Sequence, residues 1–168
     1  YDQILIGIGI NTGMMMLGTL GEEDRMEGSV ISDAVNLAAR LEGLTKLYKT
    51  PLLISEMTCM KLDPKTCKSR LIDRVAVKGK DKPVLVYEVL DADAPEVFNK
   101  KWATLETFER GWELYQNQRF EEAQEKFQEC LELAPVDTVA SLYVERCQTL
   151  ISNGWDAKTW DGVNRMET

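Results

Sequence analysis

Two side chains four residues apart, Asn36 and Arg40, are the strongest candidates for chemistry in the sequence. A spacing of four places both on one face of a helix. The planar guanidinium of arginine presents several fixed donors, which suits a phosphate group. An ordinary solvent-exposed helix face could carry the same two residues. The surrounding sequence pattern therefore has to decide between a phosphate-binding pair and a solvated surface.

A second candidate is Lys78, which lies in a Lys-Gly-Lys sequence. Glycine permits a tight turn, and ammonium groups neutralise phosphates. The same tripeptide is also typical of an ordinary exposed turn. The glycines at 7, 9 and 13 match a dinucleotide-binding loop only in part, because the apolar residues 14–17 continue as a strand where a helix should begin. The sequence therefore argues against a Rossmann site.

The 168-residue chain contains no histidine. This excludes Ser-His-Asp and Cys-His catalysis and any histidine-ligated metal. The four cysteines form no C-x-x-C pair, which argues against zinc-ribbon and thioredoxin sites, and we expect free, buried thiols. No apolar run is long enough to span a bilayer.

The net charge of −8 is unevenly distributed. Residues 1–90 carry 12 basic and 12 acidic side chains, so the whole excess lies in residues 91–168. An acidic region repels nucleic-acid backbone, so nucleic-acid binding is not expected there. The change in charge near residue 91 and the sequence Asp-Ala-Asp-Ala-Pro at 91–95 indicate a linker between two parts.

The first part alternates strand and helix patterns, which predicts an α+β fold of the α/β sandwich type. A turn is expected at 11–13. A helix beginning at Asp33 follows, with Ser32 or Asp33 as N-cap, and a short helix is predicted at 56–62. Strands are predicted at 4–10, 14–20, 51–55, 71–77 and 84–90.

The second part is predicted to be helical at 96–117, 120–133 and 137–152. Small and large residues, among them Gly111, Ala123 and Phe127, follow the spacing of a tetratricopeptide repeat. An ordinary helical hairpin is the alternative. One repeat cannot bury its own face, so the helix at 137–152 should cover it. The irregular tail at 153–168, with Trp155 and Trp160, is expected to pack back on another surface.

Residues 3–90 resemble the class III adenylyl/guanylyl cyclase catalytic domain. The resemblance rests on an ordered series of motifs, which are Asn11-Thr12-Gly13, Gly18, Gly21, Arg25, residues 28–33, Val35-Asn36, Arg40, and segments at 51–55, 73–75, 77–80 and 87–90. The resemblance implies a turn at 28–33. It implies the C-terminal half of a ferredoxin-like nucleotide cyclase domain at 1–90. An all-α, tetratricopeptide-like hairpin with one extra helix then occupies 96–152.

By this resemblance, Asn36 orients the ribose and Arg40 stabilises the α-phosphate as catalytic residues. Lys78 and Arg25 contact the phosphates, with Arg25 contributed from the opposite side of the site. Ser29 stands at the purine-reading position, where its hydroxyl favours ATP over GTP. The implied reaction is attack of the ribose 3′-oxygen on the α-phosphorus of ATP, which gives cyclic AMP and pyrophosphate.

The resemblance also implies Mg²⁺ or Mn²⁺ as cofactor, held by aspartates that lie before residue 1, so no metal ligand is expected in this chain. Asp24, Asp33 and Asp73 are interpreted as structural residues at turns or caps. The chain opens without methionine, and we expect a fragment that is inactive alone. Departures from the family pattern are Asn11 for histidine, Gly28 for an aromatic residue and Ser32 for glycine.

The partners implied are a nucleoside triphosphate, a second copy in a homodimer and a peptide or protein on the helical tail. The implied location is the cytoplasm, and the resemblance allows a membrane anchor in an N-terminal region of the intact protein. Two alternatives remain open, which are a guanylate cyclase and a non-catalytic cyclase-like module for regulation or dimerisation.

Overall fold

The computed structural model describes residues 6–22, 25–31, 33–76 and 82–165. Its main sheet has the strand order β1-β4-β6-β5-β7. The β1–β4 and β5–β7 pairs are parallel, and β6 runs antiparallel to both β4 and β5. The strands are β1 (Ile8–Ile10), β4 (Leu52–Ser55), β5 (Ser69–Ala76), β6 (Val84–Val89) and β7 (Asn164–Arg165). The predicted mixed α+β fold is confirmed, with four of these strands expected and β7 not foreseen.

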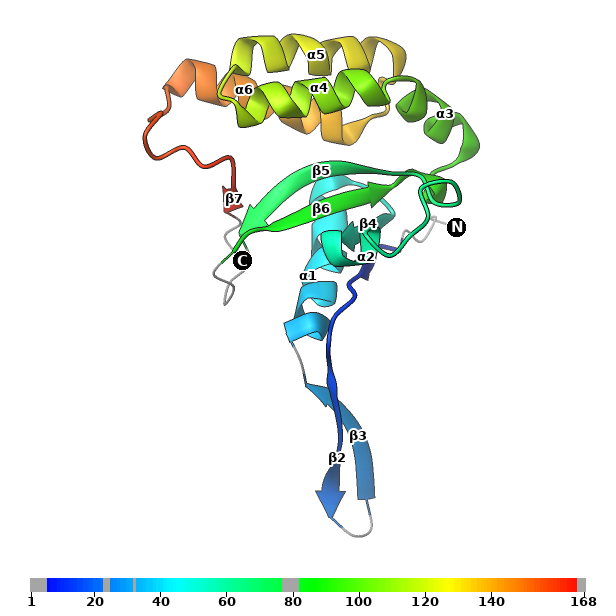
Figure 1. Cartoon of the computed structure of the whole chain (residues 1–168). Helices are drawn as coiled ribbons and strands as arrows, with labels where there is room; N and C mark the ends of the chain where they lie inside the picture. The colour runs from blue at the N-terminus through cyan, green and yellow to red at the C-terminus, as the bar shows by residue number, and fades with distance from the viewer. Residues whose placement is uncertain (1–5, 23–24, 32, 77–81, 166–168) are drawn as a thin grey trace, which may run out of the picture.

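A separate antiparallel hairpin, β2 (Met16–Glu22) and β3 (Arg25–Ile31), projects away from the sheet (Figure 1). The strand expected at 14–20 is confirmed with shifted ends. The turn expected at 28–33 is wrong, because residues up to Ile31 belong to β3. The ladder from Met16 opposite Ile31 to Glu22 opposite Arg25 satisfies the backbone polar groups, which outweighs the local preference of a glycine and a serine for turns.

Helix α1 (Asp33–Tyr48) packs against β1 and β4. It begins at Asp33, where an acidic side chain favours the positive end of the helix dipole. Its buried residues, Leu37, Leu41, Thr45 and Tyr48, recur every three or four positions and form one stripe. The predicted helix is therefore confirmed, while Ser32 lies outside the described residues.

The short helix α2 (Glu56–Cys59) ends earlier than the predicted 56–62. The Ser55 hydroxyl caps it by accepting from the Thr58 N–H. This helix contacts β4 and β6.

Four helices form a layer over the sheet (Figure 1). The layer consists of α3 (Pro95–Ala103), α4 (Leu105–Gln116), α5 (Phe120–Leu133) and α6 (Thr138–Asn153), and a single 3₁₀ turn, η1 (Leu90–Ala92), leads into it. The single helix expected at 96–117 is wrong. Thr104 departs from helical geometry, and its hydroxyl bonds the Lys101 carbonyl 3.1 Å away, which separates α3 from α4.

The close approach of α4 and α5 depends on Gly111. A Cβ at this position would lie 3.1 Å from two ring carbons of Phe127, so the glycine lets the helices meet. The contact agrees with the spacing argument, while the assignment to tetratricopeptide repeats stays a prediction, as do the domain limits at 1–90, 91–95, 96–152 and 153–168.

The irregular tail packs back onto the helices, as expected. The Trp160 ring lies edge-on to Tyr115 and Phe120, and Trp155 lies edge-on to Phe120. One hydrophobic core therefore joins α1, the sheet and the helical layer, and it includes Leu41, Ile72, Phe108 and Tyr143.

All four cysteines are free. Cys130 and Cys147 are buried as expected, while Cys59 and Cys67 are half-buried. Burial raises the pKa of both buried thiols to about 12. No helix in the described ranges is long and apolar enough to cross a membrane.

Candidate active site

Helix α1 presents Asn36 and Arg40 on one face, one turn apart, next to its buried stripe. Asn36 is exposed and Arg40 is half-buried. Within the described part of the chain, neither side chain has a hydrogen-bond or ion-pair partner. The structure thus brings these two predicted residues together and leaves their polar groups available.

Arg40 differs in this respect from the other arginines whose side chains are described. Arg70 and Arg146 are held in buried ion pairs, and Arg74 donates to the Asp161 carbonyl. The remaining three, Arg110, Arg119 and Arg165, form ion pairs at the surface. Among these side chains, the guanidinium of Arg40 is the one with no hydrogen-bond or ion-pair partner among the described residues.

The other predicted site residues do not join this pair in the described structure. Lys78 lies outside the described residues. Arg25 and Ser29 are placed by their backbone alone, both on β3 of the projecting hairpin. Arg25 pairs with Glu22 at the far end of the ladder, and Ser29 pairs with Gly18. At about 3.4 Å per residue, they stand roughly 14 Å apart along the strand.

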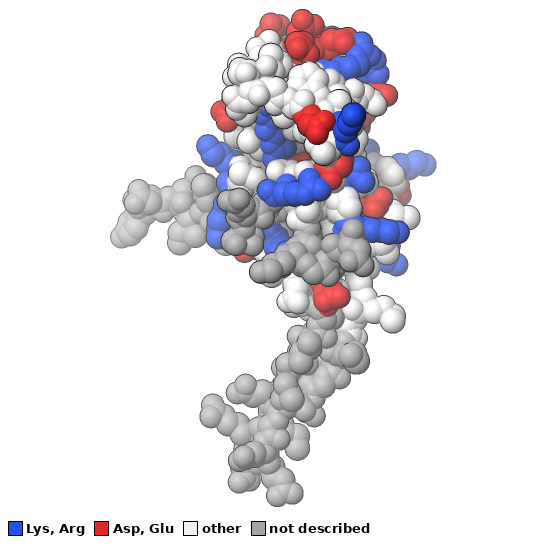
Figure 2. Space-filling view, turned by 90° about the vertical axis from the view of Figure 1, so that its left-hand side faces the viewer, with Lys and Arg blue, Asp and Glu red and all other residues white. Residues whose placement is uncertain are grey.

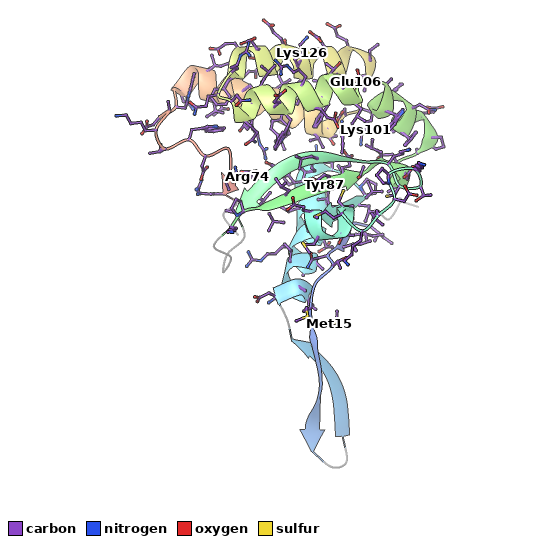
Figure 3. The ribbon with its side chains drawn as sticks, viewed as in Figure 1. Met15, Arg74, Tyr87, Lys101, Glu106 and Lys126 are labelled. Atoms are coloured by element: carbon purple, nitrogen blue, oxygen red, sulfur yellow. The ribbon has the colours of Figure 1, made fainter. Side chains whose placement is uncertain are left out.

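A cavity of about 470 Å³ opens beside the first turn of α1. It lies between the segment that follows β1, the start of α1 and the start of α2, and Asp33 and Glu56 are among its lining residues. Met15 lies on the stretch that leads from the sheet to the hairpin (Figure 3) and is exposed. The cavity does not include Asn36 or Arg40.

Asn11 fixes the geometry of this region. The sequence did not reveal this role of Asn11. Its Nδ2 donates to the Ala34 carbonyl at 3.0 Å, and its Oδ1 accepts from the Ser55 hydroxyl at 2.6 Å. Gly13 is needed as well, because a Cβ there would lie 2.7 Å from the Cβ of Ala34. Asn11 therefore ties the end of β1 to the first turn of α1.

Asp73 lies in β5 and is buried, so the expectation of a turn or cap position is wrong, although its role is structural. Its Oδ2 accepts from the Tyr48 hydroxyl at 2.5 Å, from Arg146 at 2.7 Å and from Asn164 at 3.2 Å. Burial and the Asp73 charge raise the pKa of Tyr48, which keeps this hydroxyl a donor.

The described residues do not fit a divalent cation. They contain no group of three or more cysteine, aspartate or glutamate side chains that could hold a metal ion. The Asp73 carboxylate is committed to its donors, Asp33 stands in the first turn of α1, and Asp24 is outside the described residues. We therefore derive no step through a metal from these residues.

Comparison with known proteins identifies relatives of this chain. The profile of the adenylate and guanylate cyclase catalytic domain matches residues 1–90. The chain is 38% identical over 149 residues, 88% of its length, to "Adenylate cyclase, terminal-differentiation specific" of Dictyostelium discoideum. It is 47% identical over 89 residues, 52% of its length, to "Adenylate cyclase" of Anabaena cylindrica. Because 149 residues exceed the length of the matched domain, the similarity to the first relative extends into the helical layer.

The chain spans 7% of the Dictyostelium protein and 18% of the Anabaena protein. Among solved structures, a bacterial light-regulated adenylyl cyclase matches with a TM-score of 0.46 and 27% identity, over 53% of this chain and 25% of that one. The adenylyl cyclase CyaB from P. aeruginosa matches with a TM-score of 0.41 and 36% identity, over 51% of this chain and 41% of that one.

Proposed function

The chain belongs to the adenylate and guanylate cyclase catalytic domain family, and on this premise we propose that the protein containing it converts ATP to cyclic AMP and pyrophosphate. The 3′-oxygen of the ribose forms a bond to the α-phosphorus and loses its proton. The bond from the α-phosphorus to the bridging oxygen breaks, and pyrophosphate leaves. Catalysis of this kind rests on positioning and on donors for the developing charge.

The observation that carries the proposed site is the guanidinium of Arg40, which lies beside Asn36 on α1 and has no partner among the described residues. Holding a half-buried arginine without a counter-ion is useful where an anionic ligand completes the pair. Arg40 is proposed to stabilise the charge at the α-phosphate, and Asn36 to orient the ribose. Lys78 is proposed to contact the triphosphate.

The projecting hairpin supports a site shared between two copies of the chain. β3 carries Arg25 and Ser29 away from the body, which is a placement suited to reaching a second subunit (Figure 1). In a homodimer, Arg25 would contact the phosphates of the partner's site, and Ser29 would read the purine. The relatives named adenylate cyclases favour ATP as the nucleotide, and the use of ATP favours a cytoplasmic site.

The test uses the full-length protein with Mg²⁺ or Mn²⁺, incubated separately with ATP and with GTP. Chromatography should show cyclic AMP and pyrophosphate appearing in equal amounts from ATP. Cyclic GMP formed faster from GTP would make the protein a guanylate cyclase instead. Absence of both products would contradict catalysis and favour a regulatory or dimerisation module.

We further propose that the 168-residue chain alone forms little cyclic AMP, because its described residues do not supply a metal-binding group. Steady cyclic AMP formation by the purified chain would contradict this.

A further inference from the structure

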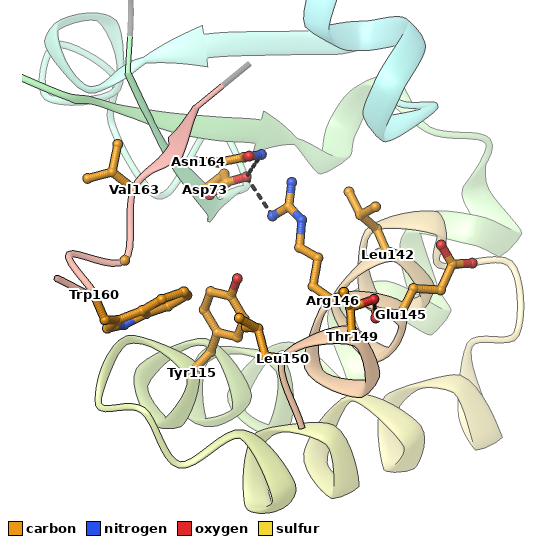
Figure 4. A pocket seen from close by; sticks show the side chains of 11 residues that line it. Asp73, Tyr115, Leu142, Glu145, Arg146, Thr149, Leu150, Trp160, Val163 and Asn164 are labelled. Carbon is orange, nitrogen blue, oxygen red and sulfur yellow. Dashed lines mark hydrogen bonds and ion pairs between the residues drawn. The ribbon is translucent and has the colours of Figure 1, made fainter. Parts of the chain in front are cut away.

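A second cavity lies where the helical layer meets the sheet, far along the chain from the proposed catalytic pair. Its volume is about 380 Å³. Residues of α4, α6, β5 and the tail line it, and Figure 4 shows them facing one space. This volume is at the lower end of the range for small-molecule sites.

Tyr115 on α4 is the first sign that this cavity takes a ligand. The residue is 7% exposed, yet its hydroxyl has no hydrogen-bond partner among the described residues. Figure 4 shows this hydroxyl pointing from the ring toward Arg146 and Asp73 across the cavity. The hydroxyl oxygen is itself open to the cavity, so a ligand acceptor can take the place of water on it.

Arg146 on α6 provides further donors at the opposite wall. One terminal nitrogen donates to Asp73 at 2.7 Å, and the side chain is 17% exposed. The guanidinium makes no other hydrogen bond to a described residue, so its remaining N–H groups can reach a ligand. Donors from two helices thus converge on one space.

The charges of the lining residues exclude an anion as the preferred occupant. Asp73 already neutralises Arg146, and the carboxylate of Glu145 adds a negative charge to the lining. Thr149 and Asn164 are neutral polar residues of the lining. The remaining wall is apolar or aromatic and includes Leu150 and the Trp160 ring, whose centre lies 5.3 Å from that of the Tyr115 ring. A flat, uncharged molecule suits such walls.

We propose that this cavity binds a small, uncharged, planar heteroaromatic molecule of at most nucleoside size. A carbonyl or ring nitrogen of the ligand accepts from the Tyr115 hydroxyl and from Arg146, while its ring lies against Trp160 and Leu150. The inference does not depend on the proposed cyclase activity.

The test is a titration of the isotope-labelled 168-residue chain with quinazolin-4-one, followed by NMR. This probe is planar, neutral and carries a carbonyl acceptor. We expect saturable shifts at Tyr115, Arg146 and the Trp160 indole, with a Kd of about 1 mM or tighter. Quinoline-2-carboxylate, which is similar in size but anionic, should bind at least about fivefold more weakly.

Two variants locate the binding. Tyr115→Phe removes one hydroxyl and should weaken binding about fivefold, while Leu150→Trp fills the cavity and should abolish it. Tyr87→Phe, on β6 and outside the cavity lining, is the matched control and should leave binding unchanged (Figure 3). Absence of saturable binding to the unmodified chain would overturn the proposal. Binding that neither cavity variant weakens, or tighter binding of the anionic probe, would overturn it too.

Discussion

Two arginines illustrate how surroundings separate a structural side chain from an available one. Arg70 is fully buried, and its nitrogens lie 2.7–2.8 Å from the carboxylates of Glu88 and Asp137. Its guanidinium also lies 4.0 Å from the centre of the Phe108 ring. Arg40 has none of these partners in the described structure. The sequence alone does not distinguish them, because Asp137 lies 67 residues from Arg70.

Alanine substitutions at Gly43 and Gly111 test how tightly the chain is packed at these two positions. In Gly43→Ala, the new methyl group meets nothing within 4 Å, so the better helix propensity of alanine should stabilise the chain by about 0.5–1 kcal/mol. In Gly111→Ala, the methyl group presses on Phe127, which is fully buried between Phe108 and Tyr143 and cannot retreat. That strain should exceed the propensity gain and destabilise by about 1 kcal/mol.

Urea unfolding of both variants measures the difference directly. Equal stabilisation by the two substitutions would show that α4 and α5 do not depend on a small residue at their crossing.

At the scale of elements, buried charges join the sheet to the helical layer. Arg70 on β5 holds Asp137, the N-cap residue of α6, with two hydrogen bonds. Lys101 on α3 donates to Glu88 on β6 at 2.5 Å and to Asp93 at 2.8 Å, and Figure 3 places it on the sheet side of the layer. In contrast, acidic side chains gather on the outer part of the helical layer in Figure 2.

Substitution of Asp137 should loosen this junction. Asp137→Asn keeps the shape but leaves the Arg70 charge with Glu88 alone, and losing one partner of a buried pair costs about 3 kcal/mol or more. Glu129→Gln is the control, since it breaks an exposed pair with Lys126 and should cost under about 1 kcal/mol. Urea unfolding at pH 7 compares them, and equal losses would contradict a role for the buried pair.

Asp137 also makes the stability of the fold depend on pH. Burial pushes the pKa of the Asp137 carboxyl upward, but the hydrogen bonds and charge of Arg70 outweigh it, so this pKa lies below its usual value. The stabilisation is therefore present above the unfolded pKa of about 4 and is lost as pH falls through the folded value. The stability difference between the chain and Asp137→Asn should shrink between pH 5 and pH 3, whereas a constant difference would contradict the assignment.

Elements with strong periodicity were predictable, and those that depend on distant partners were not. The apolar stripe of α1 and the apolar runs of β4 and β6 indicate their structures locally. Strand β3 contains Gly28 and Ser29, which suggest a turn until β2 pairs with them. The two-residue strand β7 forms only because β5 offers its edge, with the paired residues 89 positions apart in the chain.

The candidate site also has parts that the sequence predicts and parts that it does not. The spacing of Asn36 and Arg40 predicts their common face, because it needs only the helix. The cavity beside Asn11 and the one beside Tyr115 depend on contacts between distant segments, so no local sequence pattern predicts them.

For the whole molecule, the hydrophobic core does not stop at the end of the cyclase-like region. The family match ends at residue 90, yet one core includes Leu41 and Ile72 together with Phe108 and Tyr143. The Tyr143 hydroxyl donates to the Ile72 carbonyl at 2.7 Å, and the Thr138 hydroxyl donates to the Tyr48 carbonyl at 2.6 Å. The helical layer thus shares one hydrophobic core with the sheet.

This continuity predicts one cooperative unfolding transition. Amide hydrogen exchange in increasing urea should give the same opening free energy for β6 and for α5. Earlier opening of α5, with β6 still protected, would show instead that the helical layer folds independently.

The measurement closest to the central claim is the rate of cyclic AMP formation by the full-length protein carrying Arg40→Ala. Turnover should fall about 10²–10³-fold, as for loss of a donor to the transition state, with little change in KM. Stability should be unchanged, because Arg40 has no partner in the described structure. Arg110→Ala, which removes an exposed guanidinium paired with Glu113, should leave turnover unaltered. Turnover of Arg40→Ala within a few-fold of the unmodified protein would contradict the assignment of this helix face to catalysis.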